Sequence, residues 1–145
     1  MSACLLDTNI LLYLADPASG NHAATKAAVS RLLAAGDRLV VSAQVLFEFW
    51  SVATRPIGVN GLGWSAARAQ AEVETIRSRF PVLAERPAVV DLWLAIVVAH
   101  DLKGKRIHDA HLLATMQANG VTRLLTNNSA DFPPEVGISI LTPDD

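Results

Sequence analysis

The chain has 145 residues, of which 51% are hydrophobic and 18% are charged, and its net charge is −2 from 12 basic and 14 acidic side chains. This composition is typical of one compact domain and excludes a disordered chain. The near-neutral charge excludes a uniformly basic nucleic-acid-binding domain, so any contact with RNA or DNA must be local. The single cysteine, Cys4, excludes an internal disulfide framework and a cysteine-based zinc cluster. We expect it to pack as a small hydrophobic residue.

The sequence shows no repeat, low-complexity tract or linker, so we expect residues 1–145 to form a single domain. No basic segment stands at the start, and Asp7 interrupts the first apolar stretch, so we expect no signal peptide. The longest apolar run, Leu92 to Ala99, is too short to span a bilayer. We therefore expect a cytoplasmic protein without membrane contact.

Short apolar segments alternate with longer segments whose apolar residues recur at helical spacing. In chain order we expect a strand at 3–6, helices at 10–14 and 23–33, a strand at 38–43 and a helix at 44–55. A Gly- and Pro-rich loop at 56–63, a helix at 64–80, a brief strand at 81–83 and a helix at 87–102 follow. A basic loop at 103–107, a helix at 109–120 and strands at 121–126 and 137–141 complete the chain. Strands separated by helices predict right-handed crossovers and a three-layer α/β/α sandwich with a mostly parallel sheet.

Polar residues follow two of the predicted strands directly. Asp7 ends the first strand, in "CLLDTNILLYLAD", and "TNNSAD" (126–131) follows a later one. Sheets of this type place their binding sites beyond the carboxyl ends of the strands. We therefore expect Asp7 and Asp131 to lie at the same rim, together with Asp109 at the start of the predicted helix 109–120.

Each of these aspartates also has a purely structural interpretation. Asp7 and Asp109 stand where side chains cap a helix or favour its dipole. Asp131 lies in "NNSADF", where a turn aspartate is common. The sequence pattern alone leaves both interpretations open for each residue.

A fourth acid, Glu48, stands in the apolar segment "VLFEFW". On a helical wheel it shares a narrow polar stripe with Gln44, Ser51 and Arg55. Such a stripe either faces water or turns one acid toward a cleft. If the four acids do converge, their mutual repulsion raises their pKa values unless a cation is present. Mg²⁺ or Mn²⁺, which prefer oxygen ligands, would relieve the repulsion and suit the hydrolysis of a phosphodiester.

Four segments in this order resemble the PIN-domain ribonucleases: "LLDTNILLY", "VLFEF", "IHDAHLLATMQANG" and "LLTNNSADF". The nearest subgroup is the VapC-like toxins of bacterial type II (VapBC) toxin–antitoxin pairs. By this resemblance Asp7, Glu48 and Asp109 match the metal-binding acids of the family, and Asp131 matches a more variable fourth acid that binds the metal directly or through a water. Thr126 matches a residue that orients water or an acid, and the supporting positions are Thr8, Asn9 and Asn128. Many relatives carry aspartate where this chain has Asn128, which puts a second metal site in doubt.

The resemblance implies an Mg²⁺- or Mn²⁺-dependent endoribonuclease that hydrolyses RNA with a metal-activated water, leaving a 3′-hydroxyl and a 5′-phosphate. It also implies a homodimer and a cognate VapB-like antitoxin, whose arginine would pair with the carboxylates of the groove. Two other functions stay open, namely an RNA-processing nuclease without an antitoxin and a non-catalytic RNA-binding domain. A receiver-like signalling module is disfavoured, because the strand "VVSA" ends without an aspartate.

Several other residues have weaker functional signals. Lys103, Lys105 and Arg106 form the best local basic patch, which either contacts the RNA backbone or is a solvated loop. His108 and His111 stand three residues apart, but no further zinc motif accompanies them, so we disfavour a zinc site. His22 and His100 are expected to be structural, and Trp50, Trp64 and Trp93 are expected to pack in the core.

Overall fold

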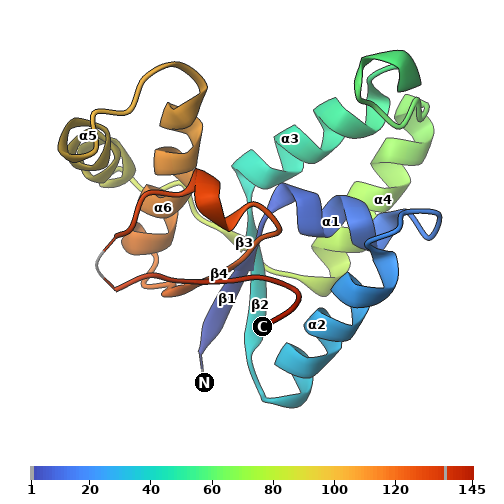
Figure 1. Cartoon of the computed structure of the whole chain (residues 1–145), viewed down its shortest axis with the longest axis horizontal. Coiled ribbons are helices and arrows are strands. Elements are labelled where there is room, and N and C mark those ends of the chain that lie inside the picture. Colours follow the sequence, from blue (N-terminus) through green and yellow to red (C-terminus); the bar gives the residue numbers. More distant parts are fainter. Residues whose placement is uncertain (1, 136) are drawn as a thin grey trace.

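The structure is a computed structural model that describes residues 2–135 and 137–145. Within these residues it has one parallel sheet of five strands in the order β3-β2-β1-β4-β5 (Figure 1). The strands are β1 (Ala3–Leu6), β2 (Arg38–Ser42), β3 (Val82–Leu83), β4 (Arg123–Leu125) and β5 (Ser139–Leu141). The prediction of a parallel sheet between helical layers is therefore confirmed.

Six α-helices connect the strands in the described part of the chain: α1 (Thr8–Ala15), α2 (His22–Ala34), α3 (Ala43–Thr54), α4 (Ala66–Arg79), α5 (Val89–Ala99) and α6 (Ile107–Ala118). Three short 3₁₀ turns accompany them: η1 (Ile57–Val59), η2 (Gly104–Arg106) and η3 (Ser129–Asp131). Helix α6 begins at Ile107, because η2 leads directly into it. Asp109 therefore lies inside the first turn of α6, and the expected start of this helix at 109 is wrong.

The order of the strands places a switch point between β1 and β4. The chain first proceeds from β1 through β2 to β3, and then returns to add β4 on the other side of β1. Because parallel crossovers are right-handed, this reversal puts the later helices on the opposite face. Helices α1 to α4 lie on one side of the sheet, and α5 and α6 lie together on the other (Figure 1). The crevice at such a switch point is the usual ligand site of this architecture.

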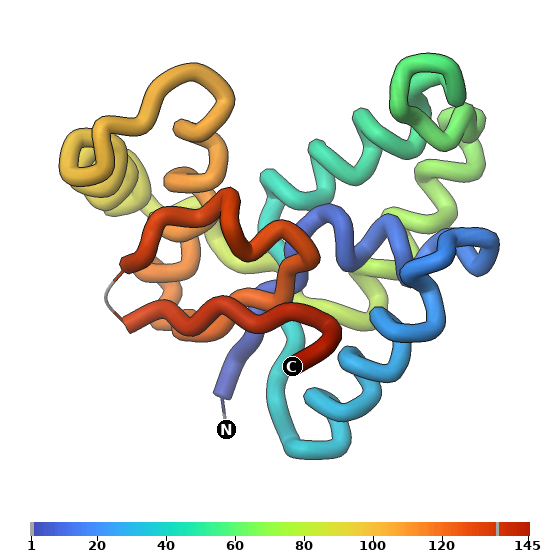
Figure 2. Tube along the Cα trace, viewed as in Figure 1, coloured from blue at the N-terminus to red at the C-terminus, as the bar shows by residue number. Residues whose placement is uncertain are grey.

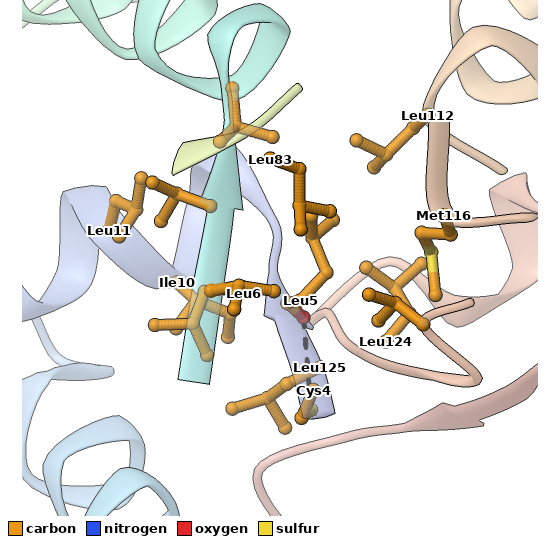
Figure 3. Packing of buried hydrophobic residues seen from close by; sticks show 14 of the residues in the cluster. Cys4, Leu5, Leu6, Ile10, Leu11, Leu83, Leu112, Met116, Leu124 and Leu125 are labelled. Carbon is orange, nitrogen blue, oxygen red and sulfur yellow. Dashed lines mark hydrogen bonds between the residues drawn. The ribbon is translucent and has the colours of Figure 1, made fainter. Parts of the chain in front are cut away.

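Strand β1 is the centre of the core. Its residues Cys4, Leu5 and Leu6 are fully buried, since helices cover both faces of the sheet. Figure 3 shows them between Ile10 and Leu11 on one side and Met116, Leu124 and their neighbours on the other. Burial raises the pKa of the Cys4 thiol to about 11, against a small lowering by Arg123. The predicted packing role of Cys4 is confirmed.

The tryptophans do not all pack in the core. The ring of Trp64 meets that of Phe49 edge to face, with 6.2 Å between the ring centres. Trp93 is half-buried, and its indole Nε1 donates to Ile107 O at 2.9 Å. Trp50 is 38% exposed, so the expectation of core packing is wrong for this residue. It lies three positions after the exposed Phe47 on α3, on the side of the helix turned away from the sheet.

Helix α5 also presents an apolar side to the exterior. Val90, Leu94 and Val98, which stand four positions apart, are 66%, 51% and 72% exposed. Among the helices that the structure describes, none combines the length and the hydropathy needed to cross a membrane.

Candidate functional site

The site begins with Asp7, which joins the end of β1 to the start of α1. Its main-chain N–H donates to Leu125 O at 3.0 Å, and its Oδ1 accepts the Thr8 N–H at 2.8 Å. Its Oδ2 accepts from Thr126 Oγ1 at 2.7 Å and from Asn9 Nδ2 at 3.2 Å. Asp7 therefore caps α1 and also lines a cleft, so the capping and the site interpretations hold together.

Glu48 reaches the same cleft from α3. The Thr8 hydroxyl donates to Glu48 Oε2 at 2.9 Å, and Gln44 Nε2 donates to Glu48 Oε1 at 3.1 Å. The Gln44 amide also donates to His108 O at 2.8 Å, which ties α3 to the start of α6. The sequence analysis assigned no role to Gln44, although its spacing of four residues from Glu48 was a usable signal. The polar stripe of this helix therefore turns Glu48 toward the cleft and not toward bulk water.

Asp109 and Asp131 complete the acidic lining. Asp109 projects from the first turn of α6, and Asp131 ends the turn η3 that follows β4. Together with Asp7 and Glu48 they line a cleft of about 280 Å³. Figure 2 shows how the chain after β4 returns beside the starts of α1 and α6. The topology thus gathers four acids that lie far apart in the sequence.

The clustering of negative charge changes the acidity of two of these groups. Burial raises the pKa of Asp7, while hydrogen bonds from Thr126 and Thr8 oppose the rise and the nearby Glu48 adds to it. Burial and the charges of Asp131 and Asp7 raise the pKa of Asp109 to about 6, against the opposing effect of Arg106. Like charges that raise one another's pKa favour the binding of a cation.

A hydrogen-bond network supports Asp7 from behind. Thr126 is fully buried, and its Oγ1 accepts from Asn9 Nδ2 at 3.3 Å and from the Asn128 N–H at 3.1 Å. The Asn9 side-chain oxygen accepts the Asn127 N–H at 2.9 Å. These bonds hold the segment after β4 against the start of α1, and fix the orientation of the Asp7 carboxylate.

The donor set of the cleft consists of carboxylate oxygens, which suit Mg²⁺ or Mn²⁺. In residues 2–135 and 137–145, no three His, Cys, Asp or Glu side chains already stand in a ready-made metal-binding group. The acids surround the cleft, and the hydrogen bonds described above hold Asp7 and Glu48 in place. The residues fit a hard divalent cation by their chemistry and by the raised pKa of Asp7 and Asp109.

Of the predicted basic patch, Arg106 lies nearest the acids. One of its guanidinium nitrogens donates to Asp131 O at 3.1 Å. Lys103 Nζ lies 3.3 Å from Asp101 Oδ2 in an exposed ion pair, and Lys105 is exposed in η2.

The histidines have separate surroundings. His111 Nε2 lies 2.6 Å from Glu85 Oε1, while His22 Nδ1 lies 2.8 Å from Tyr13 O. His100 Nε2 lies 3.1 Å from Glu135 Oε2. The contacts of His22 and His100 agree with their predicted structural role.

These features define a class of protein: a parallel α/β domain with an acidic cleft at its switch point. Residues 4–133 match the PIN domain family, which covers most of the chain. The chain therefore belongs to the PIN domain family, as the sequence motifs predicted. No curated protein matches the sequence.

Several solved structures with the same fold are bacterial toxins or toxin–antitoxin complexes. DNA-bound VapBC from Salmonella typhimurium matches with a TM-score of 0.70 and 20% identity, over 99% of both chains. A toxin–antitoxin complex from Klebsiella pneumoniae matches with a TM-score of 0.61 and 25% identity, over 97% of both chains. The Mycobacterium tuberculosis toxin VapC20, which cleaves the sarcin–ricin loop, matches with a TM-score of 0.60 and 22% identity, over 83% of this chain and 86% of its own.

Proposed function

We propose that this protein is a VapC-type toxin, a metal-dependent endoribonuclease that hydrolyses RNA phosphodiesters in the cytoplasm and is neutralised by a VapB-like antitoxin. The observation that carries the proposal is the convergence of Asp7, Glu48, Asp109 and Asp131 on one cleft. Membership of the PIN domain family and the likeness to VapBC complexes support it.

In this proposal the carboxylates of Asp7, Glu48 and Asp109 hold Mg²⁺ or Mn²⁺, with Asp131 at the outer edge of the cleft. When bound there, the cation would supply Lewis-acid activation of a water and stabilisation of charge on the phosphoryl group. Thr126 keeps the Asp7 carboxylate in a fixed orientation through its 2.7 Å bond. Thr8 does the same for Glu48 through its 2.9 Å bond. A site held in this way does not have to reorganise during the reaction, which favours catalysis.

In this proposal the exposed basic residues beside the cleft bind the RNA backbone. Arg106 lies at the edge of the acid cluster, and Lys103 and Lys105 lie in the same exposed segment. Phosphate contacts of this kind are sequence-independent and weaken as salt rises. Because the net charge of the protein is −2, local positive charge next to the proposed metal-binding cleft is needed to hold RNA, which is a polyanion.

The proposed partners would use the cleft and the exposed apolar residues of α3 and α5. An antitoxin arginine would form two parallel hydrogen bonds with a carboxylate of the cleft and so compete with the cation. The exposed apolar residues of α3 and α5, among them Phe47, Trp50 and Leu94, suit a protein that assembles with a second copy and with an antitoxin.

The deciding experiment is cleavage of a labelled RNA pool by the purified protein in Mg²⁺, Mn²⁺ or EDTA. We expect cleavage with either metal, none in EDTA, and a loss of at least about a hundredfold in Asp7→Asn, because that change removes one ligand charge. Asp91→Asn is the matched control, since Asp91 is an exposed acid on α5 outside the cleft. Equal cleavage by the wild type and Asp7→Asn, or cleavage that persists in EDTA, would contradict the proposal.

A further inference from the structure

A second cavity of about 280 Å³ lies between α5 and α6, beside the acidic cleft. Ile107 and His108 line this cavity, while the next residue, Asp109, lines the cleft. The two spaces therefore lie on two sides of the first turn of α6. Figure 1 shows α5 and α6 side by side, with their connecting segment above them. A ligand chain bound in the cleft has a short path into the cavity.

The walls of the cavity combine a flat apolar surface with a polar end. The indole of Trp93 is fixed by its 2.9 Å hydrogen bond to Ile107 O. Val90 also lines the cavity, and its side chain is 66% exposed to solvent. At the polar end His111 Nε2 lies 2.6 Å from Glu85 Oε1. A carboxylate has about four lone-pair directions, so this bond leaves Glu85 able to accept further hydrogen bonds.

We propose that this cavity, the base pocket, binds one nucleobase of the RNA whose phosphate lies in the acidic cleft. The inference rests on the proposed function and adds the means by which the RNA is selected. Single-stranded RNA is commonly read by stacking a splayed base on an aromatic or apolar wall and by bonding its edge to polar groups. The base pocket offers both kinds of contact in one open depression of the surface.

The polar end favours bases that carry an exocyclic amino group. Glu85 accepts from the amino group of cytosine, adenine or guanine, whereas uracil presents its single N–H between two carbonyl oxygens that repel a carboxylate. We therefore expect cytosine, adenine or guanine in the base pocket in preference to uracil.

Two features favour RNA over the side chain of a protein partner as the occupant. The base pocket adjoins the cleft through consecutive residues, His108 and Asp109, so a nucleotide next to the scissile phosphate reaches it without a detour. The exposed basic turn η2, which contains Lys105 and Arg106, leads into the same helix start and attracts a polyanion.

The test measures binding and cleavage separately. First, the non-cleaving Asp7→Asn protein is titrated with labelled single-stranded hexamers of adenine, cytosine or uracil in Mg²⁺. We expect the uracil hexamer to bind roughly tenfold more weakly, and Glu85→Gln to remove most of this difference. Val90→Trp, a change at an exposed position on the rim, should fill the base pocket and weaken all three hexamers. The matched control is Asp91→Trp, at an exposed polar position of the same helix that does not line the base pocket.

Second, the cleavage products of a randomised RNA pool give the base preference on each side of the cut. We expect Glu85→Gln to cleave the pool but to lose the discrimination against uracil at one flanking position. Unchanged preferences in both Glu85→Gln and Val90→Trp would overturn the base pocket even if the protein is a nuclease. Base-selective binding without any cleavage would instead contradict the proposed function and leave the base pocket supported. If Val90→Trp changes only dimer or antitoxin assembly, the cavity belongs to a protein interface and the inference is wrong.

Discussion

The hydroxyl of Thr126 donates a hydrogen bond of 2.7 Å to Asp7 Oδ2, and so joins the carboxyl ends of β4 and β1 across 119 positions of sequence. Both residues are buried, and Thr126 has no exposed surface. The bond lies at the switch point of the sheet, between the residues that directly follow the adjacent strands β1 and β4. It sets the direction of the carboxylate that belongs to both the helix cap and the acidic cleft.

Thr126→Val is expected to lower both stability and cleavage. The variant keeps the shape of the side chain but removes the donor to Asp7 and the acceptor for the Asn128 N–H. Loss of buried hydrogen bonds with partners left unpaired costs about 1–3 kcal/mol. Chemical denaturation measures this loss, and cleavage of the RNA pool should fall by at least about tenfold because Asp7 is no longer held. Thr126→Ser restores the hydroxyl, so a serine variant as impaired as valine would contradict this role.

Asp109→Asn is expected to stabilise the metal-free protein at neutral pH. The pKa of Asp109 is raised from 3.8 to about 6 in the folded state, chiefly by burial and then by the charges of Asp131 and Asp7. A raised folded-state pKa means that the folded protein favours the protonated form of Asp109. The resulting contribution to the free energy of unfolding is complete below pH 3.8 and is lost as the pH rises through 6. Since the group is only half-buried, the gain from Asn is about 1 kcal/mol after allowance for solvent screening, or roughly 3 °C in Tm.

Thermal unfolding in EDTA between pH 4 and pH 8 measures this effect. The advantage of Asp109→Asn should grow as the pH rises from about 4 to 6 and should level off above that range. Added Mg²⁺ should stabilise the wild type more than the variant, because the variant lacks one carboxylate of the cleft. An advantage of the variant that is equally large at pH 4 would assign the effect to something other than the charge of Asp109.

Cys4 is expected to resist thiol reagents while the protein is folded. Its side chain has no exposed surface, and burial raises its pKa to about 11, so almost no thiolate exists near neutral pH. Reaction with an aromatic disulfide reagent at pH 8 should be at least about a thousandfold slower than in guanidinium chloride, because β1 must open first. Fast labelling of the folded protein would show that the central strand is not the stable core described here.

Much of this architecture can be predicted from the sequence because the buried strands are almost purely apolar. "ACLL" and "RLVVS" contain enough consecutive apolar residues to mark β1 and β2, and the polar residues that follow β1 and β4 mark the rim. Topology then brings Asp7 and Asp131 to one edge without any knowledge of side-chain contacts. The position of Glu48 could not be derived in this way, because a helical wheel does not distinguish a cleft from bulk water.

The errors have equally local causes. The predicted start of α6 at 109 is wrong because the segment 103–107, whose basic residues suggest a loop, contains a 3₁₀ turn that leads directly into the helix. The expected core packing of Trp50 is wrong because the face of α3 that carries Trp50 and Phe47 is exposed. The contact of His111 with Glu85 depends on how α6 packs beside the segment after β3, and no spacing in the sequence records that distance.

Gln44 is expected to act as a positioning residue for Glu48. Its amide nitrogen donates both to Glu48 Oε1, at 3.1 Å, and to His108 O, at 2.8 Å, so it links the two helices that carry Glu48 and Asp109. Its own Oε1 is buried with no hydrogen-bond partner among the described residues. Gln44→Met removes this unsatisfied acceptor together with the two donated bonds. We therefore expect a stability change below about 1 kcal/mol but a fall in cleavage of roughly tenfold.

The matched control for this change is Gln70→Met on the exposed helix α4. Gln70 donates to Glu74 Oε1 at 3.1 Å with the same spacing of four residues, but far from the cleft. Its loss should change stability by less than about 0.5 kcal/mol and leave cleavage intact. Denaturation curves and RNA cleavage of both variants, with Mg²⁺ titrated, separate the two cases. Because Gln44 acts through a carboxylate of the cleft, its variant should also require more Mg²⁺ for half-maximal activity, whereas equal Mg²⁺ requirements in both variants would remove the positioning role.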